Sequence, residues 1–145
     1  MVSTAAALRI VFFGTPDFAV PTLQALHDSR HQIVGVVTQP DRARGRGHHS
    51  QKGPIKQLAE RHGLVTLQPE RLRDEAFVDS LRALDADLGI VAAYGKILTD
   101  AVLTIPKHGL LNVHASLLPK YRGAAPVHRA VMAGETMTGV TIMRV

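Results

Sequence analysis

The sequence predicts an α/β protein: a three-layer, Rossmann-like, mostly parallel sheet with helices on both faces. Short apolar runs alternate with segments of helical periodicity along the whole chain. This alternation is typical of parallel strands joined by crossover helices. The 145 residues can bury one hydrophobic core but not two, and no linker or internal repeat divides them. We therefore expect a single domain over residues 1–145.

The expected elements follow one another along the chain. An apolar run at 8–13 predicts a buried strand that ends at Gly14, and Thr15-Pro16-Asp17 has the capping residue, proline and acid that open a helix. A second strand at 33–38 completes a βαβ unit, for which a right-handed crossover is expected. The remaining expected elements are helices at 54–62, 70–84, 97–103 and 124–133 and strands at 64–67, 88–93, 109–115 and 140–145.

The composition excludes several classes of protein. The absence of cysteine rules out disulfides, thiolate metal sites and a cysteine nucleophile. No apolar run approaches the roughly 18 residues that span a bilayer, and the first residues lack the features of a signal peptide. We expect a monomer in the cytoplasm without membrane association.

Positive charge is concentrated between Pro40 and Lys56. Five cationic side chains and the single acid Asp41 give this segment a charge of +4 out of the net +5 of the chain. Such a segment suits an anionic partner, although solvated basic loops are also common. Gly45 and Gly47 favour a flexible loop. The adjacent His48 and His49 have no acid or cysteine beside them, so we predict no metal site.

The residues that follow the strands carry the candidate chemistry, because ligands of open α/β sheets bind beyond the carboxyl ends of the strands. After the first strand, Gly14 stands without the further glycines of a dinucleotide site, but the next helix could present its N–H groups to a substrate. Near 109–115, alternation places Asn112, His114 and Ser116 on one face. An amide donor and an imidazole suit addition to a carbonyl, while a structural histidine remains an alternative.

Four motifs, taken together and in order, resemble the methionyl-tRNA formyltransferases. They are N-V-H-A-S-L-L-P-K-Y-R-G at 112–123, F-F-G-T-P-D-F-A-V-P at 12–21, Q-P-D-R at 39–42 and A-Y-G-K-I-L at 93–98. The longest is also a feature of the wider formyltransferase superfamily, and the resemblance covers the chain from Leu8 onward. It implies transfer of a formyl group from 10-formyltetrahydrofolate to the α-amine of methionyl initiator tRNA.

The resemblance also implies roles for residues. Asn112 would stabilise the tetrahedral oxyanion, and His114 would assist through its proton. The implied folate-binding residues are Tyr94, Gly95, Ile97, Ser116, Leu117, Leu118 and Pro119. The implied tRNA-facing residues are Gly14, Thr15, Arg42, Arg44 and Arg46.

Two alternatives stay open at this stage. The chain could belong to a formyltransferase acting on a sugar-nucleotide amine, or to an RNA- or nucleotide-binding module without catalysis. A glycinamide ribonucleotide enzyme is disfavoured because no glycine-rich phosphate loop follows the first strand. The family's third catalytic residue, an aspartate in a G-L-D-T-G loop, is expected beyond Val145, and the strand-like end of the chain suggests a piece of a longer protein. We therefore expect the 145-residue chain alone to have little activity.

Overall fold

The computed structural model describes residues 7–44, 49–114 and 141–145. In these residues a sheet is formed by β1 (Arg9–Gly14), β2 (Gln32–Val37), β5 (Thr66–Leu67), β6 (Leu88–Ala92), β7 (Leu110–His114) and β8 (Thr141–Arg144). The helical elements are η1 (Asp17–Ala19), α1 (Val20–Asp28), α2 (Pro54–Arg61), α3 (Glu75–Ala83) and α4 (Asp100–Thr104). A separate antiparallel hairpin consists of β3 (Arg42–Arg44) and β4 (His49–Gln51).

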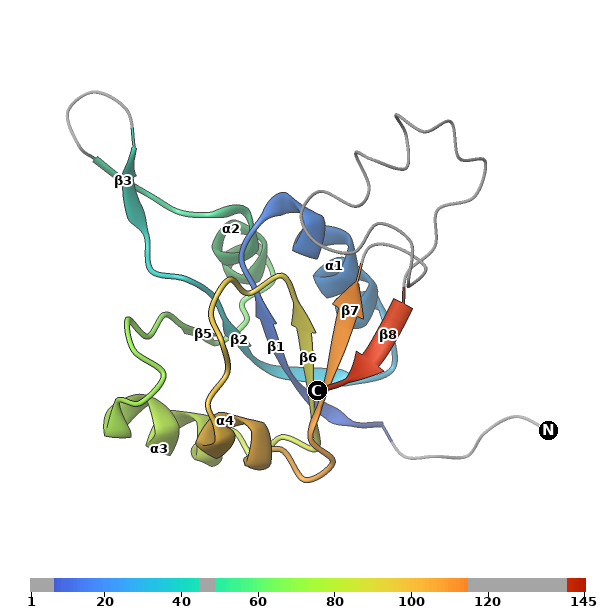
Figure 1. The fold of residues 1–145 in the computed structure, drawn as a ribbon. Helices are drawn as coiled ribbons and strands as arrows, with labels where there is room; N and C mark the ends of the chain where they lie inside the picture. Colours follow the sequence, from blue (N-terminus) through green and yellow to red (C-terminus); the bar gives the residue numbers. More distant parts are fainter. Residues whose placement is uncertain (1–6, 45–48, 115–140) are drawn as a thin grey trace.

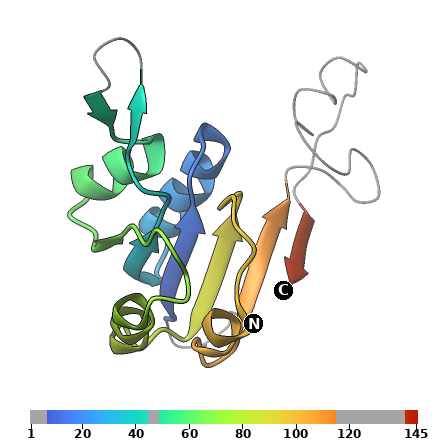
Figure 2. The same cartoon turned by 60° about the vertical axis from the view of Figure 1, so that its left-hand side comes forward.

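The main sheet has the strand order β5-β2-β1-β6-β7-β8. All neighbouring strands are parallel except β8, which runs antiparallel to β7. Helices α1 and α2 lie on one side of the sheet and α3 and α4 on the other (Figures 1 and 2). The predicted three-layer α/β architecture with a mostly parallel sheet is confirmed.

Alternate residues of the central strands supply two apolar layers. On β1, Ile10 and Phe12 pack with the helices α1 and α2, whereas Val11 and Phe13 pack with α3 and α4. Because both faces of β1 are covered, its sequence is a continuous apolar run and not an alternating one. The helix side chains buried in these layers are Leu23, Ile55, Leu58 and Ala59 on the first side and Phe77, Leu81 and Val102 on the second.

The strand order contains one reversal, at β1. From β1 the chain first moves outward to β2 and β5, and it then returns to place β6 on the opposite side of β1. The carboxyl ends of β1, β6 and β7 consequently lie next to one another at one edge of the sheet (Figure 1). This reversal is where open α/β sheets form their ligand crevice.

Two helices begin later than the sequence predicts. Helix α3 begins at Glu75 and not at residue 70, because Leu72 is already buried in a turn and Asp74 adopts the extended ψ of 127° before the helix. Helix α4 begins at Asp100 and not at residue 97, because Thr99 caps it by accepting a 3.3 Å hydrogen bond from Val102 N. The predicted helix at 124–133 lies outside the described residues.

The basic segment also differs from the expected loop. Residues 42–44 and 49–51 pair as two antiparallel strands, with Arg42 opposite Gln51 and Arg44 opposite His49. The resulting hairpin projects from the body of the protein (Figure 1). Regular secondary structure is therefore present on both sides of residues 45–48, which the glycine and arginine content did not predict.

Candidate active site at the strand ends

Strand β7 places Asn112 next to β6, the strand that adjoins the reversal at β1. Asn112 pairs with Val91 of β6 and with Met143 of β8, and its side chain is partly exposed. Its neighbour Val113 is buried in the layer of α1 and α2, so Asn112 lies on the opposite face, as alternation predicts. His114 ends the strand and pairs with Thr141. The amide is thus accessible within a regular strand, two residues before the strand ends.

The ends of β1 and β6 are joined by Thr15. Its backbone N–H donates to Ala93 O at 3.2 Å, and its hydroxyl donates to Tyr94 O at 3.0 Å. Gly14, which precedes it, sits in a space too small for any side chain, since a Cβ there would lie 2.9 Å from Ala92 O. The Gly14-Thr15 turn therefore fixes the distance between the two strand ends.

Gln39, at the end of β2, joins the same network. Its backbone N–H donates to the hydroxyl of Thr15 at 3.3 Å, and its side-chain Nε2 donates to Tyr94 O at 3.2 Å. No role was predicted for Gln39 from the sequence, although it directly follows the strand predicted at 33–38. Three neighbouring strand ends are thereby tied together through side chains.

The backbone after β6 has unusual dihedral angles. Ala93 has a φ of 57° and Gly95 a φ of 97°, both in the left-handed region that favours glycine. The hydrogen bonds to Tyr94 O hold the segment between them. Strained backbone of this kind is often found at binding sites, where the surrounding structure enforces it.

Tyr94 itself is a core residue. Its ring is 1% exposed and meets Phe13 edge to face, with 5.7 Å between the ring centroids. Burial raises the pKa of Tyr94 to about 12, so the phenol stays protonated at neutral pH. Within the described part of the chain, its hydroxyl and the buried Oε1 of Gln39 have no hydrogen-bond partner. Tyr94 contributes its carbonyl to the strand-end network, while its ring stays out of the solvent.

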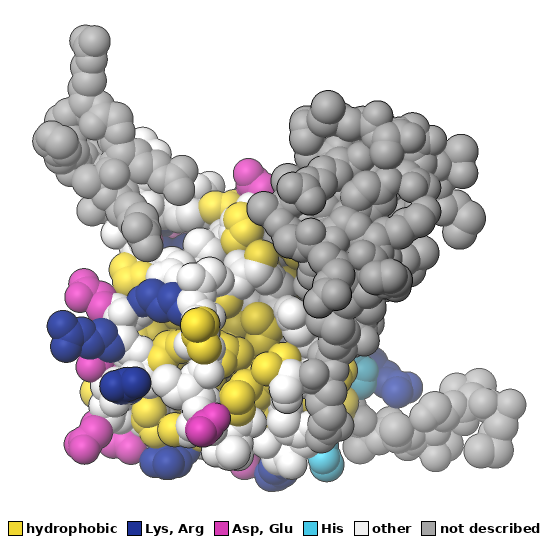
Figure 3. All heavy atoms as spheres, viewed as in Figure 1, with side chains coloured by type: hydrophobic (Ala, Val, Ile, Leu, Met, Phe, Trp, Pro, Cys, Tyr) yellow, Lys and Arg dark blue, Asp and Glu magenta, His cyan; other side chains and the backbone are white. Residues whose placement is uncertain are grey.

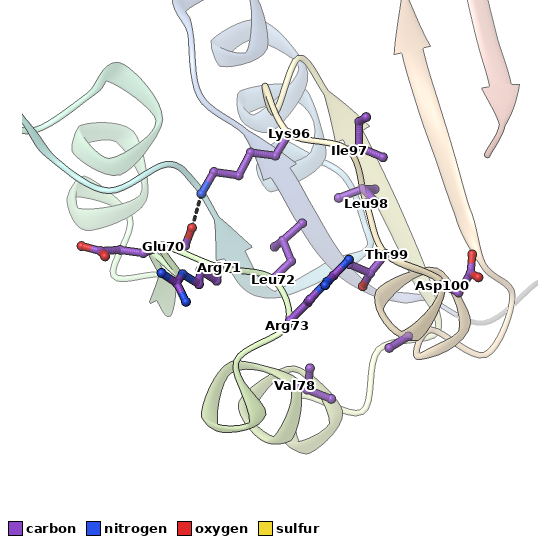
Figure 4. A pocket seen from close by; sticks show the side chains of 11 residues that line it. Glu70, Arg71, Leu72, Arg73, Val78, Lys96, Ile97, Leu98, Thr99 and Asp100 are labelled. Carbon is purple, nitrogen blue, oxygen red and sulfur yellow. Dashed lines mark hydrogen bonds between the residues drawn. The ribbon is translucent and has the colours of Figure 1, made fainter.

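Ile97 is placed very differently, with its side chain 94% exposed. It borders an open groove of about 870 Å³ on the face that α3 and α4 cover (Figure 4). Lys96 reaches across the groove and donates to the backbone carbonyl of Glu70. The other lining residues are Arg71, Leu72, Arg73, Val78, Leu98, Thr99, Asp100 and Ala101. Figure 3 shows apolar side chains gathered on this face with Lys and Arg beside them.

The structure thus brings some predicted site residues together and separates others. Gly14, Thr15, Tyr94, Gly95 and Asn112 lie at adjacent strand ends. By contrast, Arg42 and Arg44 lie in the projecting hairpin. Arg46 and the segment 116–119 are outside the described residues.

No group of three or more His, Asp or Glu side chains in residues 7–44, 49–114 and 141–145 is arranged to hold a metal ion. None of the helices found there has the length and apolar character required to cross a membrane.

Residues 8–145 match the family "Formyl transferase", and the chain belongs to this family. Among curated relatives, the methionyl-tRNA formyltransferase of Magnetococcus marinus is 58% identical over 137 residues, covering 94% of this chain and 44% of the relative. The methionyl-tRNA formyltransferase of Thermus thermophilus is 56% identical, covering 94% and 45%.

Solved structures support the same fold. Phosphoribosylglycinamide formyltransferase from Anaplasma phagocytophilum superposes with a TM-score of 0.66 at 26% identity, covering 96% of this chain and 65% of that one. A formyltetrahydrofolate deformylase from Pseudomonas syringae gives a TM-score of 0.65 at 22% identity, covering 97% and 47%. The chain spans less than half the length of the two curated relatives named above.

Proposed function

We propose that the protein transfers the formyl group of 10-formyltetrahydrofolate to the α-amine of methionyl initiator tRNA. The observation that carries this proposal is the identity of 56% and 58% with methionyl-tRNA formyltransferases, spread over 94% of the chain. The reaction belongs to translation initiation, and we place it in the cytoplasm with the protein acting as a monomer.

Asn112 and His114 are the proposed catalytic residues. When the neutral amine attacks the formyl carbon, negative charge develops on the formyl oxygen. The amide of Asn112 would donate a hydrogen bond to that oxygen, an interaction that strengthens as charge accumulates. His114 would donate to the same oxygen or accept the proton that the attacking nitrogen loses. The partly exposed position of Asn112 within a regular strand supports its role, because strand geometry limits its movement.

The groove beside Ile97 is the part of the described surface that best fits the formyl donor. A folate combines a flat aromatic ring system with anionic carboxylates. The groove offers the exposed apolar side chain of Ile97 together with the cationic side chains of Lys96, Arg71 and Arg73. Tyr94 and Gly95 support this wall through their backbone, and the proposal adds the segment 116–119 on the strength of its sequence.

The basic hairpin is the proposed contact for the tRNA acceptor. Arg42 and Arg44 belong to β3 of this hairpin, which projects beyond the same edge of the sheet as the strand ends (Figure 2), and the proposal adds Arg46 on the strength of its sequence. Cationic side chains on a projecting hairpin can neutralise backbone phosphates while the aminoacyl end reaches the crevice, where Gly14 and Thr15 would face it.

The test is an acceptor comparison with the protein at its natural length. Purified protein is incubated with 10-formyltetrahydrofolate and with methionyl initiator tRNA, a sugar-nucleotide amine, or no acceptor, and the formylated product is quantified. Formylation of the tRNA alone supports the proposal. Formylation of the sugar amine would reject the acceptor but keep the chemistry, and binding of tRNA without any formyl transfer would reject catalysis.

A further inference from the structure

The hairpin formed by β3 and β4 is held at its root by Asp41. Lys56 Nζ lies 3.0 Å from Oδ2 of this carboxylate, and Gln68 Nε2 donates to Oδ1 at 2.8 Å. Both carboxylate oxygens are therefore engaged. The side chains of Lys56 and Asp41 are only 18% and 25% exposed, so solvent screens this ion pair less than it screens one at the open surface.

The contact with Asp41 compensates for an unfavourable position of Lys56 in helix α2. Lys56 lies in the first turn of α2, which has no acidic residue there. A cation at this end of a helix is unfavourable for the helix dipole. The carboxylate of Asp41 offsets that cost and brings negative charge to the start of α2. The same contacts, first the hydrogen bond from Lys56 and then that from Gln68, keep the pKa of Asp41 below its ordinary value of 3.8.

Gln68 connects the hairpin root to the strand-end crevice. Besides its bond to Asp41, its Nε2 donates to Gln39 O at 3.2 Å. Gln39 in turn donates through its own side chain to Tyr94 O. A continuous series of hydrogen bonds thus runs from the hairpin root to the backbone behind β6.

At the other end of the hairpin, the ion pair to the body of the protein is more exposed and therefore weaker. Lys52 forms a 2.7 Å ion pair with Glu60, but these side chains are 51% and 43% exposed. Exposed pairs of this kind contribute little to stability. The backbone of Lys52 is held separately, by a 2.7 Å hydrogen bond from Gln57 Nε2 to its carbonyl. Lys52 is therefore a cation near the hairpin whose side chain can be removed without releasing the root.

We propose that Asp41, with Lys56 and Gln68, is a positioning clamp that fixes the basic hairpin in the orientation in which it receives an RNA acceptor. This inference rests on the proposed function, since it assigns the hairpin to the acceptor. Asp41 is the only acid between Pro40 and Lys56, in a segment whose cations suit an anionic partner. Without the negative charge of Asp41, the segment would attract phosphate more strongly. The role of Asp41 in this proposal is therefore to orient the hairpin, and not to increase its electrostatic attraction to RNA.

The central test replaces Asp41 by alanine in the protein at its natural length. If charge alone determined the interaction, the KM for methionyl-tRNA should fall, because the substitution makes the segment more positive. The clamp predicts the reverse: the KM for methionyl-tRNA rises about tenfold, because hairpin and crevice no longer hold the acceptor in one geometry. The kcat at saturating tRNA and the KM for the formyl donor change by less than about twofold. An unchanged or lower KM for tRNA contradicts the clamp.

Two further variants separate position from charge. Gln68→Met is uncharged and nearly isosteric, and it should raise the KM for tRNA about threefold through the lost hydrogen bonds. Lys56→Met and the control Lys52→Met remove the same charge, but only the first breaks the contact with Asp41. Equal effects of these two variants would show that charge and not position is responsible, which contradicts the proposal.

Amide hydrogen exchange supplies a measurement that does not depend on activity. In Asp41→Ala, the amides of β3 and β4 should exchange faster, while those of β1 and β6 keep their protection. Faster exchange with no formylation by the wild-type protein would reject the proposed function but keep the structural clamp. Unchanged exchange in the hairpin would reject the clamp itself.

Discussion

Replacing Gly14 by alanine tests how closely the crevice is packed. The new Cβ would lie 2.7 Å from the ring of Phe12, 2.9 Å from the Cβ of Ala19 and 2.9 Å from Ala92 O. Two of these neighbours are fixed by backbone, and the third is a fully buried ring, so relief requires the strand or the helix to move. We expect a loss of about 3 kcal/mol in the free energy of unfolding, the upper part of the range for overpacked cores.

The assay for Gly14→Ala is thermal unfolding of the protein followed by circular dichroism. A loss of this size lowers the Tm by about 6 to 12 °C for a domain of this size. The matched control is Gly53→Ala, because a Cβ at Gly53 has its nearest neighbour, Thr15 O, at 3.9 Å. The control should cost less than about 1 kcal/mol, the range for replacing glycine by alanine at a helix N-cap. Equal shifts in the two variants would refute the packing argument.

Three more predictions concern the same region. Thr15→Val keeps the shape of the side chain but removes the hydroxyl that joins the strand ends, and it should lower the free energy of unfolding by about 2 kcal/mol in the same thermal assay; an unchanged Tm would contradict this. The hydrogen bond from the Arg9 N–H holds the pKa of Asp87 below its ordinary 3.8, so the stability it provides is present above pH 3.8 and is lost as the pH falls through the lower folded pKa. Asp87→Ala should therefore be less stable at neutral pH, and acid titration of its stability should show a smaller decline than in the wild type; parallel curves would argue against it. Ile97→Ser should leave the Tm unchanged but raise the KM for the formyl donor about tenfold, since an exposed isoleucine gains burial only with a ligand. The control Val65→Ser changes an apolar residue that is 54% exposed, against 94% for Ile97, and it should leave the KM for the donor unchanged. Equal donor kinetics in the two variants would show that Ile97 does not belong to the donor site.

The sequence predicted the layers of the fold because both faces of the sheet are covered. Fully buried strands such as β1 appear as continuous apolar runs, and the helices between them have a clear apolar side. The order of the strands could not be predicted in this way. It depends on which face each crossover helix covers, and packing between segments distant in sequence determines that, not the local sequence pattern.

The errors in the predicted elements have local physical causes. Ile97 and Leu98 resemble the start of a helix in apolar character, but Ile97 faces solvent and the Thr99 cap begins the helix later. The hairpin around Arg42 and Arg44 was missed because its short strands lack an apolar alternation. Their pairing is stabilised by backbone hydrogen bonds and by a root that depends on residues distant in sequence.

Candidate site residues could be proposed from the sequence only where suitable side chains stand close together on one predicted strand. The sequence made Asn112 and His114 candidates because an amide and an imidazole lie two residues apart on one strand, and their catalytic role stays a prediction. It could not identify the network of Gln39 and Gln68, because their partners are backbone carbonyls and a carboxylate brought together by folding. Hydrogen bonds of this kind have no sequence spacing.

The central claim is that the end of β7 carries out formyl transfer, and Asn112→Asp tests it most directly. This change keeps the size of the side chain but replaces the donating amide by a carboxylate that repels a developing oxyanion. In 10-formyltetrahydrofolate-dependent formylation of methionyl-tRNA by the protein at its natural length, we predict a fall in kcat of about 10³-fold. The KM values should stay within about threefold of the wild type. The control Gln32→Glu, an exposed amide at the start of β2, should retain full activity. An Asn112→Asp variant with the kcat of the wild type would contradict the account.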